Sequence, residues 1–155
     1  MESRQIDLLQ QSFADVKPIA ATAAELFYNR LFALDPSLRP LFKGDLVRQG
    51  QMLMSMIGAA VAGLRNLDTL APVVRQLGAR HVAYGVRAEH YATVGAALLW
   101  TLEQGLGAKF TLDVKLAWAE AYALLSSLMQ AGVGEAALQP ETLAENCERA
   151  VTIAG

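Results

Sequence analysis

Apolar residues recur along the chain with the spacing of amphipathic helices. In residues 3–16, Ile6, Leu9 and Phe13 fall three or four positions apart, which places them on one face of a helix. The same spacing continues through residues 18–34, where the proline at the start suits the first turn of a helix. The pattern therefore predicts two consecutive helices at the beginning of the chain.

The next helix is predicted over residues 45–64, and its second half is apolar on nearly all sides. Residues 52–64 are interrupted only by Ser55 among the apolar and small positions. A helix without a polar face is normally buried, so we expect this one deep in the fold. The run is too short for a membrane span, which needs roughly 20 residues.

Glycines, prolines and cap residues divide the rest of the chain. Residues 35–40 hold two prolines and allow only a short helix or turns. Gly85 is expected to end one helix, and Thr111 is expected to cap another. Three further helices are predicted, over residues 66–84, 87–106 and 111–131.

The last long helix is expected to stop at Gly134, with four leucines facing the core: Leu116, Leu124, Leu125 and Leu128. Pro140 can open a short terminal helix that ends near residue 151. No segment has the pattern of a strand. We expect an all-α domain over residues 1–133 and a short extension over residues 134–155, which can be helical.

Composition strengthens the helical prediction. The chain has 155 residues, of which 54% are hydrophobic, with a mean hydropathy of +0.28. There are 27 alanines and 24 leucines, about a third of the chain, and both residue types favour helices. A chain of this length is expected to form one domain that buries its own core without metal or disulfide bonds.

The charge and the cysteine count exclude several classes of protein. Thirteen basic and fifteen acidic residues give a net charge of −2, without the basic block that nucleic-acid binding requires. The single cysteine, Cys147, permits no internal disulfide and is interpreted as a surface thiol in a reducing compartment. The N-terminus lacks an apolar signal core. We therefore expect a cytoplasmic protein that binds neither nucleic acid nor membrane.

The common catalytic motifs are missing, but the two histidines restrict the possible cofactors. The glycines at 105 and 107 follow a helix and lack a third glycine, so they predict a turn and no dinucleotide site. His81, His90 and one cysteine are too few for a structural zinc site. A lone helical histidine is usually structural, yet haem needs only one protein imidazole and an apolar slot between helices.

Several segments together resemble the bacterial single-domain haemoglobins, the globin family that includes the globin half of flavohaemoglobins. The similarity spans roughly residues 5–132. It rests on the order and spacing of FYNRLFA at 27–33, RPLF at 39–42, the helix with Gln49 and Leu53, HVAYGV at 81–86, Tyr91 with Val94 and Gly95, and AW at 117–118 followed by AY at 121–122.

This resemblance implies a globin fold, with about six to eight helices around haem b. It assigns His81 as the iron ligand, through its outer ring nitrogen, and Phe42 as the ring that stacks on the porphyrin. Tyr28 and Gln49 take the distal positions, where both can donate hydrogen bonds to dioxygen. Leu53 lies one turn after Gln49 and faces the same pocket.

The resemblance also implies further haem contacts from Leu77, Arg80, Val86, Tyr91 and Val94. Arg80 is either a partner of a haem propionate or a solvated arginine, whereas His90 is favoured as a histidine at a helix start. The related proteins place a glutamate near the proximal histidine, but Val133 stands at that position here. Glu135 follows Gly134 and is expected to lie beyond the helix.

The function implied by the resemblance is reversible dioxygen binding for storage or transport. One alternative is nitric oxide dioxygenation, which requires an external reductase because 155 residues leave no room for FAD and NAD(P)H domains. Others are a gas sensor or interaction module, and a globin-like protein that has lost haem. The expected small ligands are O2 and also NO or CO. We expect a monomer or a weak homodimer.

Overall fold

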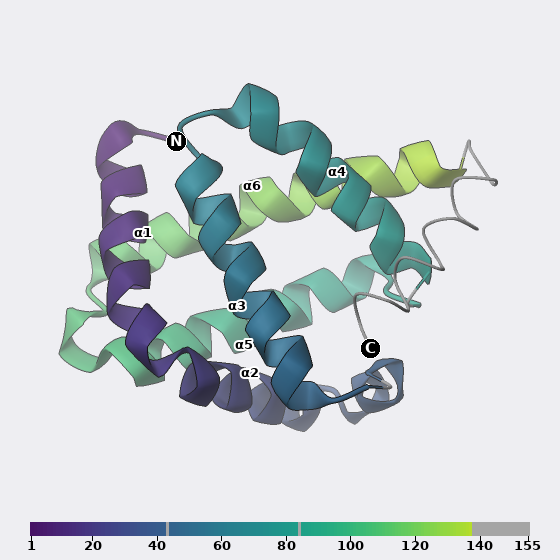
Figure 1. Ribbon diagram of the computed structural model, residues 1–155, viewed down its shortest axis with the longest axis horizontal. Coiled ribbons are helices and arrows are strands. Elements are labelled where there is room, and N and C mark those ends of the chain that lie inside the picture. The colour runs from purple at the N-terminus through teal and green to yellow at the C-terminus, as the bar shows by residue number, and fades with distance from the viewer. Residues whose placement is uncertain (43, 84, 138–155) are drawn as a thin grey trace.

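The computed structural model describes residues 1–42, 44–83 and 85–137, and within these ranges it contains helices and no strand. This confirms the all-α prediction. The described residues form six α-helices and three short 3-10 helices (η), which follow one another along the chain (Figure 1). Their bounds are α1 Ser3–Val16, η1 Lys17–Ile19, α2 Ala20–Leu34, η2 Pro36–Leu41, α3 Leu46–Gly63, α4 Leu67–Ala83, α5 Ala88–Leu106, η3 Gly107–Lys109 and α6 Leu112–Ala137.

Short polar side chains and glycines set several helix ends. The Asp45 carboxylate accepts a hydrogen bond from the Val47 amide at 2.9 Å, which caps α3. The Thr111 hydroxyl accepts one from the Val114 amide at 3.3 Å, as the sequence predicted. Gly85, with φ of +86°, follows the end of α4, where a left-handed backbone favours glycine. Pro18 lies in η1 and α2 begins after it.

The predicted end of the last helix is wrong. Helix α6 continues through Gly134 to Ala137, so Glu135 lies within it. A glycine inside a helix costs only about 1 kcal/mol relative to alanine, and the nearby Ala131, Ala136 and Ala137 are strong helix formers that offset this cost. The boundary expected between residues 133 and 134 falls inside this helix. The helix predicted after Pro140 lies outside the described residues.

The helices pack across one another around a shared apolar interior. In Figure 1, α1, α3 and α4 lie toward the viewer, with α5 and α6 behind them and α2 along the lower edge. Helix α4 packs along α6, α2 packs on both α5 and α3, and α1 packs on α6. A large core cluster joins α1, α3, α5 and α6, and a second cluster surrounds Phe27, Tyr28 and Leu31 of α2.

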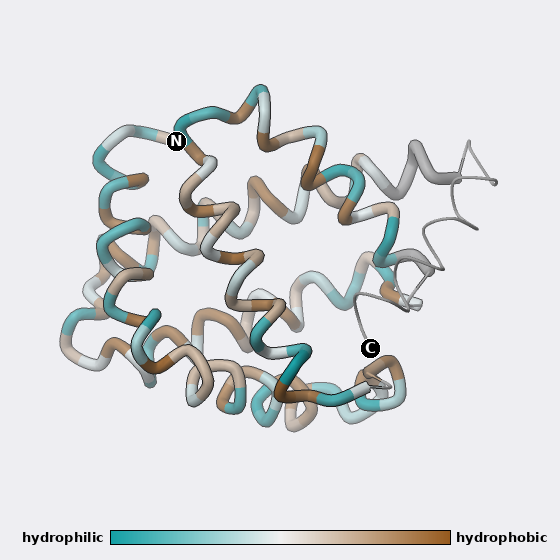
Figure 2. The backbone as a smooth tube through the Cα atoms, in the orientation of Figure 1, coloured by the Kyte–Doolittle hydropathy of each residue, from teal (hydrophilic) through white to brown (hydrophobic). Residues whose placement is uncertain are grey.

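Burial departs from the sequence prediction at two places. Of residues 52–64 only Val61 and Leu64 are buried, whereas Ser55 is exposed and Met56 is 37% exposed. The reason is that α3 packs through one side on α1, α2 and α4. Figure 2 shows that hydrophilic positions gather at its start and hydrophobic ones in its second half. Leu116 is 54% exposed, because α6 turns Val114, Ala117 and Trp118 inward instead.

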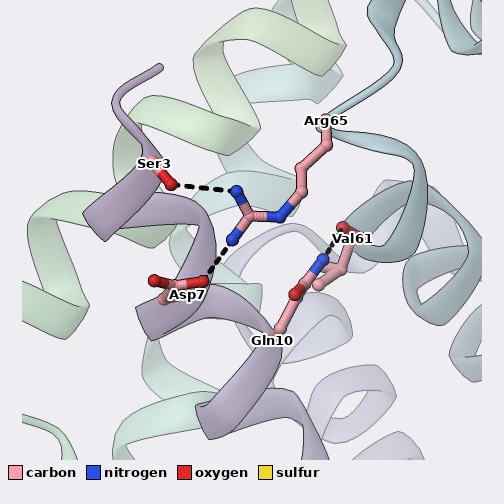
Figure 3. A network of polar contacts seen from close by, with 5 residues as sticks. All are labelled: Ser3, Asp7, Gln10, Val61 and Arg65. Carbon is pink, nitrogen blue, oxygen red and sulfur yellow. Dashed lines mark hydrogen bonds and ion pairs between the residues drawn. The ribbon is translucent and has the colours of Figure 1, made fainter.

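Polar contacts join α1 to the end of α3 (Figure 3). The Arg65 guanidinium donates to the Ser3 hydroxyl at 2.9 Å and pairs with the Asp7 carboxylate. The Gln10 amide donates to the Val61 carbonyl at 3.4 Å. Among the described helices none is both long and apolar enough to cross a bilayer.

One buried hydrogen bond joins α1 and α6, the first and last helices of the large core cluster. The Trp118 indole N–H donates to the Ser12 hydroxyl at 2.9 Å, and that hydroxyl donates in turn to the Leu8 carbonyl at 2.7 Å. Ser12→Ala leaves the buried indole N–H without its acceptor, so the free energy of unfolding should fall by about 1–3 kcal/mol. Denaturant unfolding measures this. The control Ser55→Ala, at an exposed position of α3, should change it by less than about 0.5 kcal/mol.

Candidate functional site

Helix α4 fixes the tautomer of His81. Nδ1 of His81 lies 2.7 Å from the carbonyl oxygen of Leu77, one turn earlier. A carbonyl oxygen can only accept a hydrogen bond, so Nδ1 carries the proton and the lone pair lies on Nε2. This is the arrangement found in histidines that bind a metal, where the second ring nitrogen donates to a carbonyl or carboxylate.

The surroundings of His81 also favour its neutral form. Burial lowers the pKa of the imidazole, and the positive charge of Arg80 lowers it further, while the hydrogen bond to Leu77 opposes both effects. The imidazole is therefore neutral near pH 7, because its ordinary pKa of about 6.5 is already below that pH. Only the neutral form can offer a lone pair to a metal.

A cluster of aromatic rings fixes Phe42 at the end of η2. The Phe42 ring meets Tyr28 edge to face at 5.3 Å between centroids and Phe32 at 5.4 Å. The Arg39 guanidinium lies over the Phe32 ring at 5.3 Å and donates to the Phe42 carbonyl at 3.2 Å. Both the ring and the backbone of Phe42 are thus held in one position.

Tyr28 lies where α2 crosses α3. A Cβ atom on Gly50 would be 2.7 Å from the Ala24 side chain and 3.7 Å from the Tyr28 ring, so the two helices approach closely. Gln49, which is half-buried, precedes Gly50 on α3. Burial raises the pKa of the Tyr28 hydroxyl well above its ordinary value, so the hydroxyl stays protonated and can donate a hydrogen bond.

The structure brings part of the predicted set together. Leu53, Phe42 and Val94 all pack, partly buried, on the cluster around Phe27 and Tyr28. Leu77, Arg80 and His81 follow one another on α4, and Val86 lies in the connection to α5. His90 is a histidine at the start of α5, as favoured from the sequence, since its Nδ1 accepts the Arg87 amide at 3.0 Å.

Two buried polar atoms near this region lack a partner among the described residues. These are the Tyr91 hydroxyl and the Nε of Arg80. Burial raises the pKa of Tyr91, so its hydroxyl is protonated. Tyr91 is held instead through its backbone, because the Tyr122 hydroxyl donates to the Tyr91 carbonyl. A buried polar atom without a partner is costly, so both atoms are candidates for contact with a bound group.

Sequence reasoning missed the residues that support these positions. Phe32 and Arg39 hold Phe42, and Gly50 allows the close approach of α3 to Tyr28. Gly50 stands directly after Gln49, and a glycine inside a helix that favours alanine elsewhere was a usable sign of a close crossing. The roles of Phe32 and Arg39 depend on tertiary contacts and left no comparable sign.

Replacing Tyr91 and Tyr122 by phenylalanine should change the stability of the fold in opposite directions. Tyr91→Phe removes a buried hydroxyl that has no partner, so the free energy of unfolding of the protein without cofactor should rise by about 1 kcal/mol. Tyr122→Phe is the matched control and should lower it by about 1 kcal/mol, because its hydroxyl is hydrogen-bonded. Urea denaturation compares the variants, and an equal loss in both would contradict the assignment of Tyr91.

Comparison with known proteins places this geometry in a family. Among curated relatives, a flavohemoprotein from Xylella fastidiosa is 33% identical over 128 residues, which are 81% of this chain and 32% of the relative. A flavohemoprotein from Bordetella parapertussis is 39% identical over 106 residues, or 66% of this chain and 26% of the relative. The chain thus spans about a third or less of the length of these relatives.

Solved structures share the fold. One is an engineered carbene transferase made from a proposed nitric oxide dioxygenase of Rhodothermus marinus. It superposes with a TM-score of 0.78 at 25% identity, and the match covers 87% of this chain and 94% of the transferase chain. A bacterial globin from Campylobacter jejuni has a TM-score of 0.75 at 22% identity, with coverages of 86% and 97%. The family model for globins matches residues 25–129, more than half of the chain. The chain belongs to the globin family and is a haem-binding globin.

Proposed function

We propose that this globin holds haem b through His81 and binds dioxygen reversibly, with Tyr28 and Gln49 stabilising the gas. The observation that carries the proposal is the hydrogen bond from Nδ1 of His81 to the Leu77 carbonyl, which directs the lone pair of a partly buried, neutral imidazole to Nε2. When bound, haem would supply an iron atom that can bind both a protein imidazole and a small gas.

The types of the remaining residues support a flat, largely apolar group with two carboxylates. Leu53, Val94 and Phe42 pack on one apolar cluster, and Leu77 and Val86 would add apolar contacts from α4 and the connection that follows it. The buried Nε–H of Arg80 is a donor without an acceptor among the described residues, and a propionate of haem would satisfy it. Tyr91 would contact the same group from α5.

The two residues proposed as distal can both donate hydrogen bonds. Tyr28 remains protonated because burial raises its pKa, and Gln49 directly precedes Gly50, where α3 approaches Ala24 and the Tyr28 ring. A hydrogen bond to a charged acceptor contributes about 1.5–3 kcal/mol, which corresponds to roughly tenfold to a hundredfold in dissociation. A bound gas with partial negative charge would accept these hydrogen bonds, so the two donors are expected to slow its release.

A second candidate is nitric oxide dioxygenation with a separate reductase. It is favoured by the structural similarity to an engineered form of a proposed nitric oxide dioxygenase, and by relatives named flavohemoproteins. Purified protein supplied with dioxygen, NADH and an added flavin reductase would then convert NO to nitrate over many turnovers, with dioxygen supplying both added oxygen atoms and NADH the electron for each turnover. Consumption that stops after one equivalent per haem would favour dioxygen binding instead.

Haem ligation is tested with the two histidines. His81→Ala should abolish the Soret band of protein purified after expression with excess haem, because the second histidine of the chain, His90, lies at the start of α5 and accepts the Arg87 amide through Nδ1. His90→Asn is the matched control, since an asparagine oxygen can still accept the Arg87 amide, and it should retain the band. A full Soret band in His81→Ala would reject the assignment.

Distal stabilisation is tested by stopped-flow measurement of dioxygen dissociation. Tyr28→Phe and Gln49→Leu should each accelerate release by about tenfold or more, because each removes one donor. Gln51→Leu changes the same residue type at an exposed position two residues further along α3, and it should leave the rate unchanged. Unchanged dissociation rates in both variants would contradict the proposal that Tyr28 and Gln49 stabilise bound dioxygen.

A further inference from the structure

Helices α4 and α6 touch backbone to backbone at a pair of glycines. A Cβ atom on Gly78 would lie 1.9 Å from the carbonyl oxygen of Met129, and one on Gly132 would lie 1.8 Å from the carbonyl oxygen of Arg75. The two contacts are reciprocal, since each glycine faces the backbone of the other helix. Both glycines are buried.

Gly78 and Gly132 face the backbone of a neighbouring helix, whereas other helical glycines, such as Gly105, face a side chain that can move. A Cβ on Gly105 would meet only the end of the Ile19 side chain, at 3.3 Å, and that side chain can rotate. A carbonyl oxygen within a helix cannot rotate away. Since real Cβ atoms essentially never approach another heavy atom closer than 3.0 Å, an alanine at Gly78 would force the two helices apart by roughly 1 Å.

The crossing lies in the same turn of α4 as the anchor of the His81 ring. Gly78 directly follows Leu77, whose carbonyl accepts the Nδ1 proton, and it precedes His81 by three residues. Within a helix these residues move as one body, because each turn is joined by backbone hydrogen bonds. A displacement of the Gly78 backbone therefore carries both the imidazole and its acceptor with it.

Helix α6 also fixes α5. The Tyr122 ring lies so close to α5 that a Cβ on Gly95 would be 2.6 Å from it, and the Tyr122 hydroxyl donates to the Tyr91 carbonyl. The helix that sets the position of His81 thus sets that of Tyr91 as well. Movement of α4 relative to α6 changes the place of the imidazole relative to the rest of the site.

We propose that Gly78 and Gly132 are positioning residues for the His81 imidazole, because their missing side chains set the separation of α4 and α6. This rests on the proposed role of His81 as the iron ligand. The glycines act through the backbone of α4, and neither touches the cofactor.

The test uses the full haem-loaded chain and the iron–histidine stretching band of the ferrous protein, recorded by resonance Raman spectroscopy. Gly78→Ala and Gly132→Ala should each shift this band, whereas the control Gly105→Ala should not. The double variant should shift it by less than the sum of the two, since one separation of the helices accommodates both added methyl groups.

A second arm separates positioning from a general structural effect. In His81→Gly protein supplied with free imidazole, the ligand is no longer attached to α4, so adding Gly78→Ala should leave the iron–imidazole band unchanged. A shift that persists there would overturn the proposal, as would unshifted bands in both alanine variants. Failure of both variants to fold, while Gly105→Ala folds, would also overturn it, because the glycines would then be structural only.

The proposed function fails in a different way. If His81 is not the ligand, wild-type protein lacks an iron–histidine band and His81→Ala keeps its Soret band. A wild-type band that neither alanine variant shifts would leave the role of His81 intact and reject the positioning role of the glycines alone.

Discussion

The contact between α4 and α6 leaves no room for a side chain on either backbone at the point where they cross. The helix that carries His81 is consequently held by peptide groups, which move less than side chains do. The hydrogen bond to Leu77 then transfers that fixed position to the imidazole ring. Helix α6 also positions α5 through the hydrogen bond from Tyr122 to Tyr91, so α6 supports two of the helices that carry residues of the candidate site.

The other side of the site is built on the same physical idea with different residues. Gly50 lets α3 approach Ala24 of α2. At this crossing the Tyr28 ring lies beside Gly50, the residue that follows Gln49. Aromatic packing then relates Tyr28 to Phe42. Close helix crossings at small residues thus set the spacing on both sides, and larger side chains fill the space that these crossings define.

The periodicity of apolar residues predicted the helices and most of their limits, because hydrophobic spacing and caps are local signals. The Asp45 and Thr111 caps illustrate this, since each acts on an amide two or three residues away. The end of α6 at Ala137 and the exposure of Leu116 depend on what the helix packs against, which a local pattern does not contain. The tautomer of His81 and the role of Gly78 likewise depend on contacts that form only in the folded chain. The site residues were predicted through the family resemblance, which rests on the order and spacing of several segments along the chain.

The order of helices along the chain has a consequence for how the protein matures. Helix α6 is the last element of the described chain, yet it supports α4 through Gly132 and α1 through the Trp118–Ser12 hydrogen bond. During synthesis, α4 therefore emerges before the helix it packs on exists. A domain folds stably only when contacts between distant parts of the chain can form. We therefore expect the chain to bind haem stably only after α6 has emerged from the ribosome.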